Sequence, residues 1–254
     1  MAFVAPARRP DGERLVLKVS IDDEETRHEP DALALWSGRG AVRLVRSDPL
    51  LGAMLLERVE PGIPLERACP RDHAISVACA LLRRLRREVP GGHPFLPART
   101  LAERWARELR EDHERLGGPI DRALLAETIA CCRDLARDSS PTFLVNRDFH
   151  LGNILEARRE PWLLIDPKPL AGEAAFDTGY FLTTLLPDPP DPSSARLLIR
   201  QLASELSLDP ERIRAWALVR SVENALRSLG VDRDEGPPES FGRYLSEARA
   251  LAAT

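Results

Sequence analysis

The sequence predicts an α+β protein with a small strand-rich lobe followed by a larger, mostly helical lobe. Short apolar runs separated by turn residues fill the N-terminal part, whereas longer segments of helical periodicity dominate further along the chain. Three short apolar runs at 143–145, 154–155 and 162–165 interrupt the helical part, and each ends at a polar residue. This pattern is typical of buried strands with polar side chains at their ends. We expect the small lobe at 1–59 and the helical lobe at 60–254.

Composition limits the classes of function. A chain of 254 residues can bury one substantial core or two lobes. The net charge of −4 argues against a nucleic-acid partner. The sequence has no apolar run long enough to cross a membrane and no apolar signal segment at its start, so we expect no membrane contact and a cytoplasmic location. We also expect a monomer.

The basic residues are almost all arginine. Of the 36 Lys and Arg residues, only Lys18 and Lys168 are lysine. Both fall inside candidate site motifs. An ammonium and a planar guanidinium are not interchangeable against phosphate oxygens, which gives a chemical reason for the two lysines, although chance placement stays an alternative.

The N-terminal part contains a hairpin signal. Apolar runs at 3–7 and 14–20 flank an Asp-Gly pair at 11–12, which favours a tight turn between two strands. Lys18 lies among apolar residues of the second run, where a lysine is usually an edge charge or extends its ammonium to the surface. An acidic segment at 22–37 predicts the first helix. Further strands are expected at 41–45 and 52–57.

Helical periodicity begins near residue 70. Proline residues at 70 and 97 favour helix starts, and the glycine pair at 117–118 favours a helix end. The predicted helices lie at 70–89, 98–116, 120–138, from 172 onward, 193–207, 210–229 and 238–252.

Three polar residues near the apolar runs suggest phosphoryl transfer. Asp148 is followed five positions later by Asn153, and Asp166 ends the next strand. The first carboxylate can orient an attacking hydroxyl, and the other two side chains can hold Mg2+ against nucleotide phosphates. Each motif alone is weak evidence for phosphoryl transfer, since an Asp-Pro pair such as Asp166-Pro167 more often forms a turn. The ordered set favours the functional interpretation.

These motifs resemble a known family. The run Asn146–Asn153, followed by Ile165–Pro169 and Phe176-Asp177, is similar to the aminoglycoside phosphotransferases, and most of all to their streptomycin 6-kinase and hydroxyurea-resistance kinase branch. The resemblance implies a protein-kinase-like two-lobe fold. It also implies a kinase that uses Mg2+ and ATP, with GTP as the alternative, to phosphorylate a small hydroxyl-bearing molecule. The acceptor implied first is an aminoglycoside such as streptomycin, so that the enzyme confers antibiotic resistance.

The resemblance assigns roles to residues in the catalytic stretch. It implies that Asp148 is the catalytic base and that Asn153 and Asp166 are the metal ligands. His150, Lys168 and Asp177 take supporting positions. Asn146 stands where the family usually carries His, and we interpret it as a structural substitution.

The resemblance also assigns nucleotide contacts. Lys18 matches the strand lysine that contacts the α- and β-phosphates, and Glu29 matches its helix partner. Pro30 disfavours a helical conformation at Glu29, so Glu25 is the alternative, and a solvated acidic face stays open for Glu25 and its neighbour.

The end of the strand at 52–57 resembles a kinase hinge. The backbone groups of Glu57 and Val59 would then bind the adenine edge. An ordinary strand followed by a Pro-Gly turn is the alternative.

The chain departs from the family before Lys18. Family members place a glycine-rich phosphate loop there, and no G-x-G-x-x-G precedes Lys18. Compared with the family, roughly the first forty residues are absent, which implies either a start codon assigned too late or a relative with a truncated small lobe. Besides the aminoglycoside kinase, two alternatives stay open: a kinase for an unrelated metabolite and a catalytically impaired kinase-like binding protein.

A cationic acceptor would need carboxylates around it. We expect an acidic surface between the Asp148 loop and the helices at 98–138 and 193–229, although for any one helix acid a surface pair with a nearby arginine is the more common role. The candidates are Asp148 itself, Glu173 and Asp177, together with Glu103, Glu108, Asp112 and Glu223.

Overall fold

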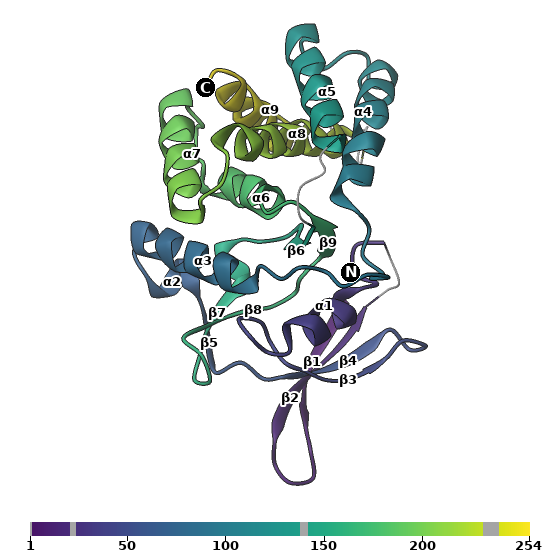
Figure 1. The fold of residues 1–254 in the computed structure, drawn as a ribbon, viewed down its shortest axis with the longest axis vertical. Helices are drawn as coiled ribbons and strands as arrows, with labels where there is room; N and C mark the ends of the chain where they lie inside the picture. Colours follow the sequence, from purple (N-terminus) through teal and green to yellow (C-terminus); the bar gives the residue numbers. More distant parts are fainter. Residues whose placement is uncertain (1, 21–23, 138–141, 231–238) are drawn as a thin grey trace. The chain divides into compact units, whose positions relative to one another are not determined.

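The computed structural model describes residues 2–20, 24–137, 142–230 and 239–254 (Figure 1). The chain forms two compact units. The first unit combines Met1–Phe95 with Phe143–Ala171, and the second combines Leu96–Thr142 with Gly172–Thr254. These units divide the chain differently from the predicted lobes, whose boundary at residue 59 stays a prediction.

A four-stranded antiparallel sheet occupies the N-terminal part of the first unit, in the order β1-β2-β4-β3. The Asp-Gly turn joins its first two strands as predicted, with Gly12 at φ 92°. Lys18 lies on a central strand, opposite Val4 and Met54, and its side chain is buried. It is therefore neither an edge charge nor a surface-reaching lysine. The strands are β1 (Ala2–Arg8), β2 (Arg14–Ser20), β3 (Leu44–Asp48) and β4 (Ala53–Glu57).

The third strand lies later than predicted. The expected strand at 41–45 is displaced to β3, because the start of that run pairs elsewhere. Ala41 bridges Leu164, and the Val42 N–H donates to the Leu164 carbonyl at 2.9 Å. A long-range backbone pairing therefore overrides the local apolar pattern.

The first helix, α1 (Glu29–Trp36), is shorter than the predicted segment. Pro30 lies in its first turn, where a missing N–H costs nothing, so the helix starts at Glu29 rather than earlier. Residues 21–23 lie outside the described ranges. Leu33 and Trp36 are fully buried, and the Trp36 indole donates to the Leu85 carbonyl at 2.8 Å. The helix is thus fixed against the rest of the first unit.

The first unit also contains two small sheets. Strands β5, β7 and β8 form one of them, in the order β5-β7-β8, and strands β6 and β9 pair in the other. The second pairing places the loop after β6 beside the segment that leads into β9. The elements are β5 (Pro61–Pro64), α2 (Leu65–Ala68), α3 (Arg71–Leu85), β6 (Phe143–Asn146), the short helix η1 (Leu151–Asn153), β7 (Ile154–Ala157), β8 (Trp162–Leu164) and β9 (Pro169–Gly172).

Arg159, in the turn between β7 and β8, ties several segments of the first unit together. Its guanidinium donates to the carboxylate of Glu57, with an Nε–Oε2 distance of 3.1 Å. It also donates to the carbonyls of Ala41, at 3.1 Å, and Gly38. Charged hydrogen bonds to partners that would otherwise stay unsatisfied are among the more costly to remove.

We expect Arg159→Ala to destabilise the protein by about 2–4 kcal/mol, since two carbonyls lose their side-chain donor and the Glu57 carboxylate keeps only the Arg43 N–H, at 3.0 Å. Arg158→Ala is the matched control, because Arg158 is 80% exposed and lies 3.9 Å from Glu60. That change should cost less than about 0.5 kcal/mol. Denaturant unfolding of both variants measures the difference, and equal costs would contradict the role of Arg159.

The second unit is a helical assembly in which α8 is heavily buried. Trp216 of α8 packs its ring edge-on against Phe176 at 4.9 Å and against Trp105 at 6.5 Å between ring centroids. None of the described helices is long and apolar enough to span a membrane. The helices are α4 (Ala98–Arg115), α5 (Arg122–Ala136), α6 (Ala175–Leu185), α7 (Pro192–Leu206), α8 (Pro210–Leu229) and α9 (Glu239–Ala252).

Glu247 of α9 makes stability depend on pH. Burial raises the pKa of Glu247 to about 7, although its ion pair with Arg243 at 3.0 Å opposes the shift. The folded state therefore holds a proton that the unfolded chain releases above its ordinary pKa near 4.5. The stabilisation that this proton provides is complete below that value and is lost as the pH rises toward 7.

Glutamine cannot ionise. We therefore expect the free energy of unfolding of Glu247→Gln to decrease between pH 5 and 8 by on the order of 2 kcal/mol less than that of the wild type. Chemical denaturation across this pH range measures the slope. An unchanged slope in the variant would show that other groups cause the pH dependence.

Candidate active site

The buried side chain of Asn146 organises the loop that follows β6. Its Oδ1 accepts the backbone N–H of Asp148 at 3.0 Å and that of Lys168 at 2.8 Å. The Arg147 N–H donates to the Lys168 carbonyl at 2.8 Å. One side-chain oxygen therefore fixes both loops, which gives Asn146 a structural role.

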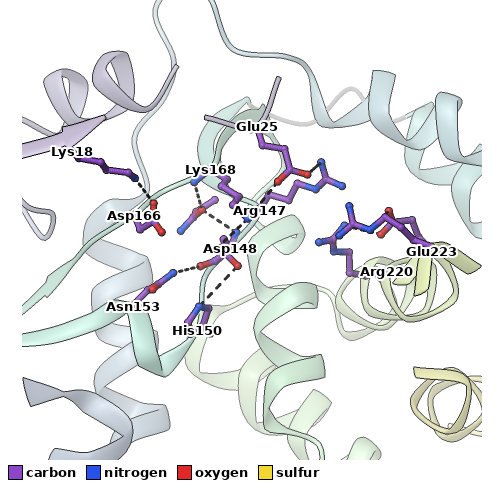
Figure 2. Close-up of polar contacts among 12 residues, drawn as sticks. Lys18, Glu25, Arg147, Asp148, His150, Asn153, Asp166, Lys168, Arg220 and Glu223 are labelled. Carbon is purple, nitrogen blue, oxygen red and sulfur yellow. Dashed lines mark hydrogen bonds and ion pairs between the residues drawn. The ribbon is translucent and has the colours of Figure 1, made fainter. Parts of the chain in front are cut away.

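The same loop positions Asp148 and Asn153 (Figure 2). The Asn153 side chain donates its Nδ2 to the Asp148 carbonyl at 3.2 Å. His150 closes the turn by accepting the Gly152 N–H at its Nδ1, and its Nε2 lies 3.9 Å from Asp148 Oδ1. The imidazole thus stabilises the turn through Gly152 and makes no tight hydrogen bond to the Asp148 carboxylate.

Asn153 also connects the loop to Asp166. Its carbonyl accepts the N–H of Ile165 at 2.9 Å, directly before Asp166. Asp166 adopts φ 51°, in the left-handed region that Asp and Asn tolerate better than most residues. The side chain is 48% exposed, so the carboxylate is open to a ligand.

Lys18 joins the sheet, α1 and Asp166. Its Nζ lies 2.6 Å from Glu29 Oε2 and also contacts Asp166 Oδ1. Glu29 is fully buried, so Pro30 does not prevent the contact that the sequence predicted for it. The alternative partner, Glu25, makes its contacts elsewhere.

Two carboxylates keep Lys18 charged. Burial alone would lower the pKa of Lys18, but the charge of Glu29 and hydrogen bonds to Asp166 and Glu29 raise it overall. Burial raises the pKa of Glu29 to about 7, against the pull of Lys18. The lysine therefore presents a permanent cation beside Asp166.

Lys168 and Glu25 form a second group of charges next to Asp148. The Lys168 ammonium lies 3.4 Å from Asp148 Oδ2 and 3.3 Å from Glu25 Oε2. The other oxygen of Glu25 pairs with the buried Arg147 at 2.9 Å. Sequence reasoning missed Arg147 and this use of Glu25, because no local pattern relates residues so far apart in the chain.

The side chains around Asp166 suit magnesium. Mg2+ prefers oxygen ligands and commonly takes one or two carboxylates, with water and phosphate completing its shell. Asp166 offers an exposed carboxylate, and Asn153, whose Nδ2 is engaged, has its Oδ1 as the remaining acceptor. Within the described ranges no three His, Cys, Asp or Glu residues form a metal cluster. The donor set thus fits a metal held jointly with a phosphate ligand.

The predicted hinge residues end β4 and follow it. The Glu57 N–H already donates to the Arg43 carbonyl at 3.0 Å, and its carboxylate holds Arg159. Adenine contacts by Glu57 and Val59 stay a prediction. Asp177 lies in the first turn of α6, in the second unit, and is largely buried.

The acids expected to bind a cationic acceptor are mostly paired with arginines inside the second unit. Glu173 binds Arg212 and also accepts the Trp216 indole N–H at 2.6 Å. Glu223 lies 2.8 Å from Arg220. Similar pairs are Glu108 with Arg104 and Asp112 with Arg115. These pairs favour the structural alternative for the acids concerned.

Comparisons with known proteins agree with the motifs. The family model described as aminoglycoside/hydroxyurea antibiotic resistance kinase matches residues 2–232. The chain is 38% identical over 231 residues to a hydroxyurea phosphotransferase of Kitasatospora aureofaciens, covering 89% of this chain and 65% of that protein. It is 34% identical over 229 residues to a streptomycin 6-kinase of Streptomyces glaucescens, covering 89% and 74%. The chain thus spans a little under two thirds of the length of the first of these relatives.

Solved structures confirm the protein-kinase-like fold. A Plasmodium vivax ethanolamine kinase aligns with TM-score 0.65 and 13% identity, covering 98% of this chain and 79% of that one. A thermostable mutant of aminoglycoside phosphotransferase APH(4)-Ia, in complex with ADP and hygromycin B, aligns with TM-score 0.64 and 15% identity, covering 100% and 92%. At these identities the likeness concerns the fold alone.

Proposed function

Because the chain belongs to the aminoglycoside/hydroxyurea antibiotic resistance kinases, we propose that it transfers the γ-phosphoryl group of ATP to a hydroxyl of a small molecule. The observation that carries the proposal is the hydrogen-bonded frame of the first unit. It joins Asp148 to Asn153, Asn153 to the residue before Asp166, and Asp166 to Lys18. Phosphoryl transfer depends on such positioning and on charge stabilisation more than on covalent chemistry.

Each residue would have a separate task. Asp148 would accept the proton of the acceptor hydroxyl, and Asn153 and Asp166 would hold Mg2+. The metal, when bound, supplies positive charge against the nucleotide phosphates. Lys18, held in place by Glu29, would contact the same phosphates. His150 and Asn146 would keep the loop in shape.

The acceptor is proposed from the relatives. Streptomycin is the first candidate, with antibiotic resistance as the consequence, because two relatives at 33% and 34% identity are streptomycin 6-kinases. Hydroxyurea is the second candidate, because a relative at 38% identity is a hydroxyurea phosphotransferase.

An acceptor panel tests the proposal. Purified protein is incubated with Mg2+ and ATP or GTP, together with streptomycin, hydroxyurea or a neutral sugar, and nucleoside diphosphate release is measured. Release that depends on streptomycin, with binding that weakens as salt rises, would identify a cationic acceptor. Release only with hydroxyurea would identify the second candidate. Nucleotide binding without transfer to any of them would instead favour a kinase for an unrelated metabolite or a kinase-like binding protein.

A further inference from the structure

The only two lysines of the chain both contact carboxylates of the candidate active site. Lys18 contacts Asp166, and the Lys168 Nζ lies 3.4 Å from Asp148. The other 34 of the 36 basic residues are arginine. A composition that uses arginine almost everywhere therefore keeps a compact ammonium at these two positions.

The backbone of Lys168 is rigidly placed relative to Asp148. Both residues donate their N–H groups to the same Asn146 Oδ1, at 2.8 and 3.0 Å. The Lys168 carbonyl also accepts the Arg147 N–H. Pro167 and Pro169 on either side restrict the backbone further. The side chain of Lys168 thus starts from a fixed point beside Asp148.

The ammonium itself is held loosely between two carboxylates. Its distances of 3.4 Å to Asp148 and 3.3 Å to Glu25 exceed the roughly 2.7–2.9 Å of a tight charge-assisted hydrogen bond. An ammonium has three donors that can turn toward a new acceptor, whereas a guanidinium would bind one carboxylate through its planar fork. The side chain is also 31% exposed. Lys168 can therefore reach a third anionic group.

We propose that Lys168 is a catalytic residue that binds the phosphoryl group during its transfer. This proposal rests on the proposed function, in which Asp148 holds the acceptor hydroxyl. The phosphorus that this hydroxyl attacks must come close to Asp148, and so within reach of the Lys168 ammonium. Negative charge spread over the equatorial oxygens of the moving group would draw Lys168 away from Glu25.

Lys168 neither gains nor loses a proton during the phosphoryl transfer. The acceptor oxygen forms a bond to the γ-phosphorus, and the bond from that phosphorus to the β–γ bridging oxygen breaks. The bridging oxygen leaves with the electron pair as part of ADP, and the hydroxyl proton passes to Asp148. Lys168 stays protonated and supplies charge stabilisation only.

Comparison of two nucleotides tests the proposal. Lys168→Ala should bind ADP within about twofold of the wild-type affinity, but should bind AMP-PNP, which carries a γ-phosphate, roughly tenfold more weakly with Mg2+ present. Its kcat should fall about 10²–10³-fold, as for removal of another donor to a transition state. Ethylammonium added to the solution should restore part of the lost kcat. Arg137→Ala removes an exposed cation and serves as the charge-matched control.

Other outcomes overturn the proposal in distinct ways. If Lys168→Ala weakens ADP and AMP-PNP equally, or lowers the melting temperature without a change in their ratio, Lys168 has a structural role only. An unchanged ratio and an unchanged kcat would remove it from the site. If the wild-type protein transfers phosphate to no acceptor, the proposed function fails, but the nucleotide comparison still decides whether Lys168 binds a γ-phosphate. Wild-type protein that binds neither nucleotide contradicts both proposals.

Discussion

Asp148→Asn should lower kcat for phosphoryl transfer by at least about 10³-fold, within the range expected for loss of a general base. Asparagine has nearly the same shape as aspartate but cannot accept the hydroxyl proton. The backbone N–H of residue 148 would still donate to Asn146, and the carbonyl would still accept from Asn153, so the loop should keep its conformation. Affinity for MgATP should stay within about threefold of wild type, because Asp148 is not a proposed metal ligand.

The experiment measures ADP release at saturating acceptor, with calorimetry for MgATP binding and a melting curve for the fold. Asp134→Asn is the matched control, since Asp134 is an exposed helix residue paired with Arg137. Near-normal turnover in Asp148→Asn would remove Asp148 from the mechanism.

Asp166→Ala should raise the Mg2+ concentration for half-maximal activity by at least tenfold, or abolish metal-dependent nucleotide binding, as one of few protein ligands to the metal is lost. The change also removes one of the two carboxylates at Lys18, whose Nζ keeps its 2.6 Å contact with Glu29. The sheet and α1 should therefore stay joined.

A second variant, Asp166→Asn, separates the effect of losing the metal ligand from the effect of backbone strain. Asp166 adopts φ 51°, which alanine disfavours and asparagine tolerates. Both variants should lose Mg2+ affinity, but the alanine variant alone should also lower the melting temperature by a few degrees. Calorimetry with MgATP that gives wild-type affinity in both variants would place the metal elsewhere.

Local patterns in the sequence predict much of this fold. The Asp-Gly turn, the proline-led helices and the short strands around Asp148 all follow from turn chemistry and periodicity, and the structure has them close to the predicted positions. The strand expected at 41–45 is the clearest failure. It moves because Val42 pairs with Leu164, and a pairing over so many residues leaves no local signal.

The candidate site is likewise predicted only in part. The order of Asp148, Asn153 and Asp166 is visible in the sequence, as are the two lysines. The contacts that hold these residues in place are not visible there. Asn146 serves two loops through one oxygen, Glu25 links Arg147 to Lys168, and these partners lie far apart in the chain. Long-range partners of charged residues are set by tertiary packing, which a single sequence does not display.

Transfer of a label from the γ-phosphate of ATP tests the central claim most directly. Wild-type protein, Mg2+ and labelled ATP are incubated with streptomycin or hydroxyurea, and the products are separated and identified by mass. We predict that the label appears in a phosphorylated acceptor, requires Mg2+ and disappears with Asp148→Asn. Label released only as inorganic phosphate, or transferred equally by the Asp148→Asn variant, would contradict a phosphotransferase built on Asp148.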